Sequence, residues 1–188
     1  GKIAAYIRFD DRPDLGPHVK YALSLNVSPE LRGSALGEAI FQVSIDKEAK
    51  ESVLLGNFFP KIPAGMMYIE RAGWIIVEVE TVDFGKDKIQ RRFVIQRDDT
   101  ENDAYGSRTH RLMKIRDSQE SVRELERSGF VIKKFVFPQD QEKMLDVVDR
   151  SIQEGLVVTR YFSDTADTNI RYAVFERRRT HEEVRRAA

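Results

Sequence analysis

The sequence predicts an α/β or α+β fold, with a mixed, largely antiparallel sheet flanked by helices. Short apolar segments with a period of two residues recur along the chain, separated by Gly, Pro, Asp and Asn, which is typical of strands joined by turns. Segments of good helix formers lie between some of them. Several of these segments are followed by Gly, a frequent residue just beyond a helix end.

Composition bounds the class of protein. The chain has 188 residues, 41% hydrophobic and 33% charged, which is enough for a sizeable core. Its 31 basic and 31 acidic residues balance, so we expect no obligatory nucleic-acid partner, because such domains usually carry a basic excess. No apolar run approaches the roughly 20 residues of a membrane span. The absence of cysteine excludes disulfides and is compatible with a reducing compartment, so we expect a cytoplasmic protein.

Two alternating segments at the start of the chain predict a β-hairpin with one buried face. The turn-rich stretch DDRPDLGP separates them. The apolar positions of the two strands are Ile3, Ala5, Ile7 and Phe9, and Tyr21, Leu23, Leu25 and Val27.

The rest of the first half alternates in type. Residues 36–50 fit either a helix or a strand. Residues 53–59 predict a short apolar strand, and residues 65–72 a helix that ends at Gly73. A second hairpin is expected from residues 74–81 and 88–96.

A polar stretch at residues 98–107 predicts a linker, which divides the chain into residues 1–97 and a second α/β part at 108–178. This second part forms its own subdomain or completes the first, and residues 179–188 form a charged tail. Its predicted elements are a strand at 111–116, a helix at 118–127 capped by Ser118 and ended by Gly129, a strand at 131–137, a helix at 140–154 ended by Gly155, and a hairpin of 157–162 and 170–175.

The stretch after Val27 is the most informative, because a strand runs through a Pro-containing turn into a segment that can form a helix. Small residues there let backbone N–H groups approach a ligand, and a helix N-terminus adds unpaired donors and partial positive charge. A plain strand-to-helix turn with Arg32 in solvent is the alternative. The candidate pyrophosphate-binding residues are Val27, Arg32, Gly33, Ser34, Ala35, Leu36 and Gly37.

These residues, VSPELRGSALG, resemble the cofactor loop of the GNAT (general control-type N-acetyltransferase) superfamily, whose pattern is Arg-x-x-Gly-x-Gly/Ala after a strand ending in Val-x-Pro. Residues 68–74, YIERAGW, resemble the Tyr-Glu-Lys-Leu-Gly-Phe segment of the same family. The resemblance covers residues 1–97. It implies transfer of an acyl group from acetyl-CoA or another acyl-CoA to a small-molecule or protein amine, and a homodimer is left open. It also implies that the loop amides hold the pyrophosphate and that a backbone N–H near Val27 polarises the thioester carbonyl.

The sequence departs from the family pattern at catalytic positions. Ala35 stands where the family has its middle glycine, and Ile69 stands where a tyrosine often protonates the leaving thiolate. The strand before the loop has no carboxylate for a general base. The candidates that remain are Tyr68 as the acid, with Glu78 or Glu80 as a base acting through water.

The family normally has a strand, two helices and another strand before the position occupied by Gly1. We expect one of three explanations. The sequence is a piece whose first portion is missing, the second half supplies equivalent elements as in a permuted fold, or the likeness of the two motifs is coincidental.

Other readings stay open. The protein is alternatively a non-catalytic regulatory or protein-interaction protein with a degenerate cofactor loop. Glu78 and Glu80 share a strand face, and we expect Arg91, Arg92 and Arg97 to approach from the facing strand. This pattern resembles the Glu-x-Glu strands of tunnel-type triphosphatases, or it is ordinary cross-strand ion pairing. The three histidines lack metal-binding spacing, so no metal site is expected.

Overall fold

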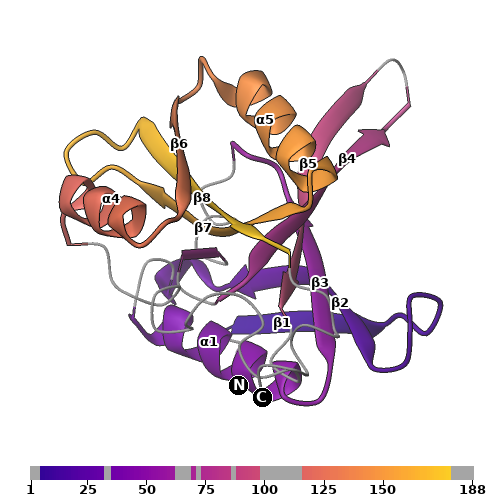
Figure 1. Cartoon of the computed structure of the whole chain (residues 1–188). Helices are drawn as coiled ribbons and strands as arrows, with labels where there is room; N and C mark the ends of the chain where they lie inside the picture. The colour runs from indigo at the N-terminus through magenta and orange to yellow at the C-terminus, as the bar shows by residue number, and fades with distance from the viewer. Residues whose placement is uncertain are drawn as a thin grey trace. The chain divides into compact units, whose positions relative to one another are not determined.

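The computed structural model describes residues 5–31, 35–61, 69–70, 73–85, 88–97 and 116–178. They form an α+β fold with a mixed, mostly antiparallel sheet, which confirms the predicted class (Figure 1). The chain divides into two compact units. Unit 1 comprises residues 1–56 and 96–102, and unit 2 comprises residues 57–95 and 103–188. The predicted linker at 98–107, most of the predicted strand at 111–116 and the tail at 179–188 lie outside the described residues.

Unit 1 contains a three-strand arrangement in the order β1-β2-β3. The first two strands pair antiparallel, which confirms the first hairpin, and the third pairs parallel with the second. Parallel neighbours need a crossover connection, usually a helix, and this requirement decides that the ambiguous segment at 36–50 is helical. The elements are β1 (Ala5–Asp11), β2 (Val19–Val27), the 3₁₀ turn η1 (Pro29–Leu31), α1 (Ala35–Ala49) and β3 (Val53–Phe58).

The single buried face expected for β2 is wrong, because a β-bulge interrupts the strand. Ser24 pairs with Arg8 and Ala22 pairs with Phe9, so Leu23 is an extra residue between them. A bulge shifts the two-residue alternation, so residues on its two sides change face. Accordingly Leu23 is 49% exposed.

Unit 2 contains the hydrogen-bonded order β5-β4-β7-β8-β6. The pairs β4–β7, β7–β8 and β6–β8 are antiparallel. Both hairpins predicted in this region, 74–81 with 88–96 and 157–162 with 170–175, are confirmed. The strands are β4 (Ile75–Asp83), β5 (Ile89–Arg97), β6 (Val131–Val136), β7 (Leu156–Ser163) and β8 (Ile170–Arg177).

Two helices cover opposite faces of this part of the sheet, α4 (Ser118–Arg127) and α5 (Gln141–Gln153). On one face Leu125 of α4 belongs to a buried cluster with Phe162. On the other, the hydroxyl of Tyr161 donates to the sulfur of Met144 on α5, at 3.3 Å. Tyr161 and Phe162 are consecutive in β7, and consecutive strand residues point to opposite faces. Figure 1 shows α5 running beside the β4–β5 hairpin.

The boundaries of both helices follow local chemistry. Gly129 and Gly155 adopt φ of +87° and +85° after the helix ends, as their glycine identity predicted. The expected Ser118 cap is wrong, because Asp117 is the N-cap and its carboxylate accepts from the N–H of Glu120 at 2.9 Å. Asp is an equally good N-cap residue, and the Ser118 hydroxyl instead donates to the carboxylate of Asp164 at 2.8 Å.

Candidate functional site

The candidate phosphate loop lies in the β2–α1–β3 crossover of unit 1. β2 ends at Val27 and α1 begins at Ala35, so the predicted order of strand, turn and helix is present. In such units ligands commonly bind beyond the carboxyl end of the strand. The first amides of α1 belong to Ala35, Leu36 and Gly37, and the first-turn N–H groups of a helix have no intrahelical acceptor. Arg32, Gly33 and Ser34 lie outside the described residues.

The η1 turn places an acidic group in this connection. Hydrogen bonds from its own backbone N–H and from the Ser28 hydroxyl lower the pKa of Glu30 below its usual value. Glu30 is therefore ionised at neutral pH and opposes a bound phosphate.

The C-terminal half of α1 buries Ile45 and Ala49 and also makes contacts through charged groups. Lys20 of β2 donates to Glu48 at 2.6 Å. Arg97, at the end of β5 and 2% exposed, donates to Asp46 at 2.6 Å, and Gln42 donates to the same Asp46 oxygen at 2.9 Å. These contacts fix where the helix lies and hence where its N-terminal amides begin.

The candidate bases Glu78 and Glu80 lie on β4, in unit 2. At the hairpin turn the N–H of Phe84 donates to the carbonyl oxygen of Lys88, so these two residues face each other. In an antiparallel pair, the residue four positions before Phe84 then faces the residue four positions after Lys88, which places Glu80 opposite Arg92. The Nε of Arg92 donates to Glu80 at 2.6 Å, and both side chains are less than one-third exposed. Glu78 is exposed. Glu80 is thus committed to a cross-strand ion pair, and Glu78 is the carboxylate open to solvent.

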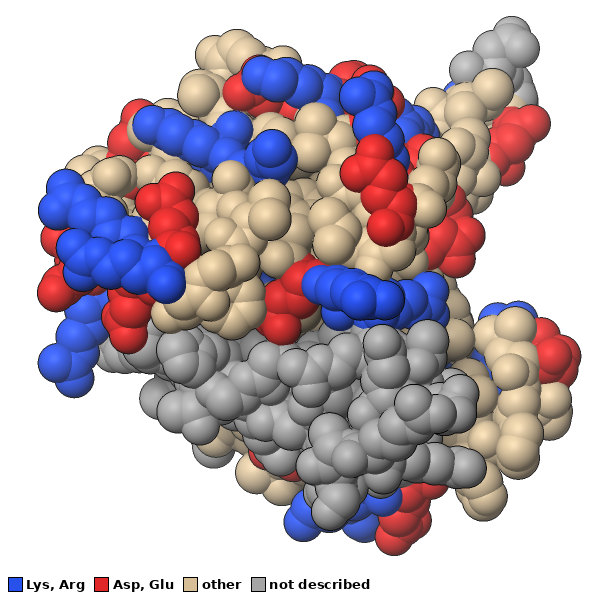
Figure 2. Space-filling model, viewed as in Figure 1, with Lys and Arg blue, Asp and Glu red and all other residues tan. Residues whose placement is uncertain are grey.

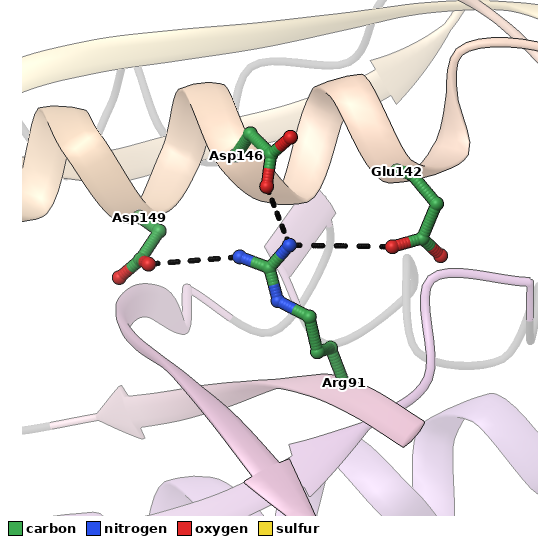
Figure 3. Close-up of polar contacts among 4 residues, drawn as sticks. All are labelled: Arg91, Glu142, Asp146 and Asp149. Atoms are coloured by element: carbon green, nitrogen blue, oxygen red, sulfur yellow. Dashed lines mark hydrogen bonds and ion pairs between the residues drawn. The ribbon is translucent and has the colours of Figure 1, made fainter. Parts of the chain in front are cut away.

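Of the three arginines expected near these glutamates, Arg92 pairs with Glu80, whereas Arg91 and Arg97 pair with other carboxylates. Strand alternation puts Arg91 on the opposite face of β5 from Arg92. Figure 3 shows its guanidinium turned toward three carboxylates of α5, at 2.5 Å from Asp146, 3.5 Å from Asp149 and 4.0 Å from Glu142. This acid cluster was missed from the sequence, although spacings of four and three residues place the three side chains on one helix face.

The candidate acid cannot be placed, since Tyr68 lies outside the described residues. Its neighbour Ile69, which the resemblance sets at the position of the family's tyrosine, is helical and fully buried. It is part of the apolar interior.

A buried carboxylate in unit 2 was also missed. Asp164, 5% exposed, accepts from the hydroxyls of Ser118 and Tyr172, the amide of Gln119 and the backbone N–H groups of Ala166 and Asp167. The N–H of Ala166, followed by the Ser118 hydroxyl, lowers the pKa of Asp164 strongly. No motif marks Asp164 in the sequence, because its partners come from two distant segments. It joins the start of α4 to the β7–β8 turn.

Across the described part of the chain, no group of three or more His, Asp or Glu side chains is arranged to hold a metal ion. None of the described helices is both long enough and apolar enough to cross a membrane. On the face shown in Figure 2, basic and acidic side chains are interspersed over the described residues. Neither a protein-family model nor a curated protein sequence matches the chain, so its candidate function rests on the residues and geometry given above.

Proposed function

We propose that the protein is an acyl-CoA-dependent N-acyltransferase that transfers an acyl group to a small-molecule or protein amine. The observation that carries the proposal is the β2–α1–β3 crossover, in which the loop residues resembling the GNAT cofactor loop stand between the end of a strand and the start of a 15-residue helix. Helix amides and loop N–H groups are suited to a pyrophosphate.

The reaction is direct aminolysis of the thioester. The amine nitrogen attacks the carbonyl carbon, the C–S bond breaks, and CoA leaves as a thiolate that takes up a proton. A backbone N–H near Val27 stabilises the developing oxyanion, and Arg32 complements the phosphate charge. Glu78 accepts the amine proton through water, and Tyr68 protonates the thiolate. Glu80 is the weaker base candidate, because its carboxylate is already paired with Arg92.

A titration with acetyl-CoA, followed by thermal unfolding, tests the proposal. Ligand at about 100 times its dissociation constant stabilises a protein by about 2.7 kcal/mol, which raises the melting temperature. Gly33→Pro and Arg32→Ala should remove or reduce this shift. Arg8→Ala is a matched control, since Arg8 is an exposed arginine of the same unit that pairs with Asp10. Absence of any shift with the unmodified protein would sink the proposal.

Measurements of kcat distinguish between the two candidate bases, Glu78 and Glu80. Glu78→Gln should lower kcat by roughly 10² or more, as expected for loss of a general base, while acetyl-CoA still binds. Glu80→Gln should affect kcat less and stability more, because it breaks the pair with Arg92.

The second candidate is a non-catalytic protein that keeps a degenerate cofactor loop for regulation or protein interaction. Two observations favour it, namely the pairing of Glu80 with Arg92 and the burial of Ile69 where an acid would stand. It predicts acetyl-CoA binding without turnover for any tested amine, or no binding together with a specific protein partner in pull-down experiments.

A further inference from the structure

Strand β6 of unit 2 stands at one end of the strand order of the sheet, beside β8 (Figure 1). Just beyond the two strands, the N–H of Phe137 donates to the carbonyl oxygen of Asn169 at 2.7 Å, so these residues form a hydrogen-bonded pair. In an antiparallel ladder such pairs alternate with pairs whose backbone groups point away from the neighbouring strand. The odd-numbered residues of β6 therefore bond to β8. The backbone groups of Ile132, Lys134 and Val136 point outward.

Contacts within unit 2 close this outward edge at both ends. At one end the carbonyl oxygen of Val136 accepts from the N–H of Asp140 at 2.7 Å, and the N–H of Val136 donates to the Asp140 carboxylate at 2.8 Å. At the other end the N–H of Phe130 donates to the carbonyl oxygen of Leu125 at 3.1 Å. Between these ends, the other two even-numbered residues keep outward N–H and C=O groups that no described strand pairs with. Two donors and two acceptors are thus open to a short extended segment.

The side chains along this open edge are basic and apolar. Lys133 and Lys134 are exposed and lie on opposite faces of the strand, and neither forms an ion pair within the described part of the chain. Val131, at the start of β6, is 46% exposed and lines a cavity of about 590 Å³. Glu176 and Arg177 contribute opposite charges to the cavity wall, whose apolar members include Phe130, Leu156 and Phe175. One end of the edge is therefore apolar, and its middle carries two positive charges.

We propose that the β6 edge binds an extended, acidic peptide segment of a partner protein by strand addition. Main-chain hydrogen bonds to Ile132 and Lys134 supply affinity, and side-chain contacts supply selectivity. In an antiparallel addition, the partner residues opposite Lys134 and Lys133 share the faces of these lysines, so both partner residues are acidic. Two positions further along, the partner residue opposite Val131 is apolar, because it lies on the face of Val131 beside the cavity.

The charges disfavour a second copy of the chain at this edge. If two β6 strands paired antiparallel through the outward groups of Ile132 and Lys134, Lys133 would stand opposite Lys133 of the other copy. Like charges directly opposite each other destabilise a ladder. Lysines on edge strands commonly prevent such self-pairing. An acidic segment replaces this repulsion with attraction, so the same lysines select the partner.

Amide hydrogen exchange followed by NMR on the full chain tests the site. In the free protein the amides of Lys133 and Phe135, which bond to β8, should exchange slowly, and those of Ile132 and Lys134 should exchange fast. The probe is an acetylated and amidated peptide with the central sequence Glu-Glu-Val-Leu, and the control peptide has Lys-Lys-Val-Leu. With the Glu peptide at about ten times its dissociation constant, exchange at Ile132 and Lys134 should slow roughly tenfold. The Lys peptide at the same concentration should leave it unchanged.

Matched variants separate charge from strand addition. Lys134→Glu should weaken binding of the Glu peptide roughly fivefold and strengthen binding of the Lys peptide, because it turns a cross-strand attraction into a repulsion. Lys88→Glu is the control, since Lys88 is an exposed lysine of the same unit outside β6, and it should leave binding unchanged. N-methylation of the valine in the Glu peptide, which stands opposite Ile132, should weaken binding by removing a main-chain donor. A purely electrostatic contact would not lose affinity in this way.

Three results would overturn the site, and all are measured on the unmodified protein. The first is slow exchange at Ile132 and Lys134 without peptide, which would show that the edge is already covered. If that protection grows with protein concentration, the occupant is a second copy of the chain. The second is equal binding of the Glu and Lys peptides. The third is binding of the Glu peptide that leaves the two amides exchanging as fast as before.

This site lies within unit 2 and does not rest on the acyltransferase proposal. Arg32→Ala, which should weaken acetyl-CoA binding, should leave protection of the β6 amides by the Glu peptide unchanged. A protein that binds no acetyl-CoA would end the proposed function and leave the edge site intact. Amides of β6 that the Glu peptide fails to protect would end the edge site and leave the acyltransferase proposal standing.

Discussion

Helix α1 of unit 1 and helix α5 of unit 2 are attached to their strands in different ways. The described face of α5 that meets the sheet is apolar, and it buries Met144, Leu145 and Val148. In the described part of α1, Ile45 and Ala49 are buried and Val43 is 68% exposed. Two ion pairs, Lys20–Glu48 and Arg97–Asp46, join this helix to the strands. Apolar burial contributes about 25 cal/mol per Å², whereas partly exposed ion pairs contribute little. Among the side chains the structure describes, α5 thus contributes the larger apolar contact, and α1 adds ion pairs to the burial of Ile45 and Ala49.

The largest effect is expected from the apolar attachment. Leu145→Ala should lower the free energy of unfolding by about 2–5 kcal/mol, because Leu145 is fully buried and its truncation leaves a cavity. Denaturant unfolding followed by circular dichroism measures the change. The matched control is Val43→Ala on α1, which should cost less than about 0.5 kcal/mol, as expected for an exposed site. Equal losses for the two variants would show that α1 is packed as firmly as α5.

This difference also explains which helix could be predicted. The apolar positions of residues 140–154 recur with helical spacing, so α5 was predicted to within one residue at each end. Residues 36–50 fit both patterns, because Phe41, Val43 and Ile45 have the two-residue spacing of a strand and lie among good helix formers. The crossover between parallel strands, which is not a local property, decides that α1 is a helix.

In the candidate site, too, local features could be predicted from the sequence and contacts between distant residues could not. The strand that ends at Val27 and the Pro-containing turn after it were readable from local signals, whereas the helix that begins at Ala35 was not. The partners of Arg91 and Arg97 were not, because one lies on α5, more than 50 residues away, and the other on α1. The bulge at Leu23 escaped prediction for a related reason, since a one-residue insertion leaves no compositional mark.

The second effect concerns the buried end of the α1 attachment. Asp46→Ala should cost about 1–3 kcal/mol, the range for a hydrogen bond to a charged group, because it leaves the guanidinium of the buried Arg97 without this carboxylate. Urea unfolding measures the loss, and Arg97→Met with the double variant gives the coupling between the two. Added salt should reduce the loss only in part, since Arg97 is buried and poorly screened while the Asp46 side chain is 38% exposed. If the losses in the free energy of unfolding of the two single variants add up to that of the double variant, the pair contributes nothing to stability.

The third effect is a dependence of unit 2 on pH. The folded pKa of Asp164 is lowered, so its stabilising contribution is present above the unfolded pKa, near 3.9, and is lost as the pH falls further toward the folded value. Thermal melts should show stability declining below about pH 4. Asp164→Asn should flatten that decline. At pH 7 it should also lower stability, because asparagine keeps one acceptor oxygen for the Ser118, Gln119 and Tyr172 donors but turns its NH2 group toward the N–H groups of Ala166 and Asp167. If the variant loses as much stability below pH 4 as the parent protein does, carboxylates other than Asp164 cause the loss.

The smallest effect should come from the exposed end of the α1 attachment. The ion pair of Lys20 and Glu48 is about 29% and 28% exposed, so Lys20→Met should cost only about 0.2–1 kcal/mol, less in high salt. The hydrogen bond to Glu48 raises the pKa of Lys20, so the contribution is full at neutral pH and is lost only as the pH rises through the folded pKa, above about 10.4. Salt-dependent unfolding of the parent and the variant measures this. A loss as large as that of Leu145→Ala, insensitive to salt, would mean that α1 is held by a desolvated charge network and is attached as firmly as α5.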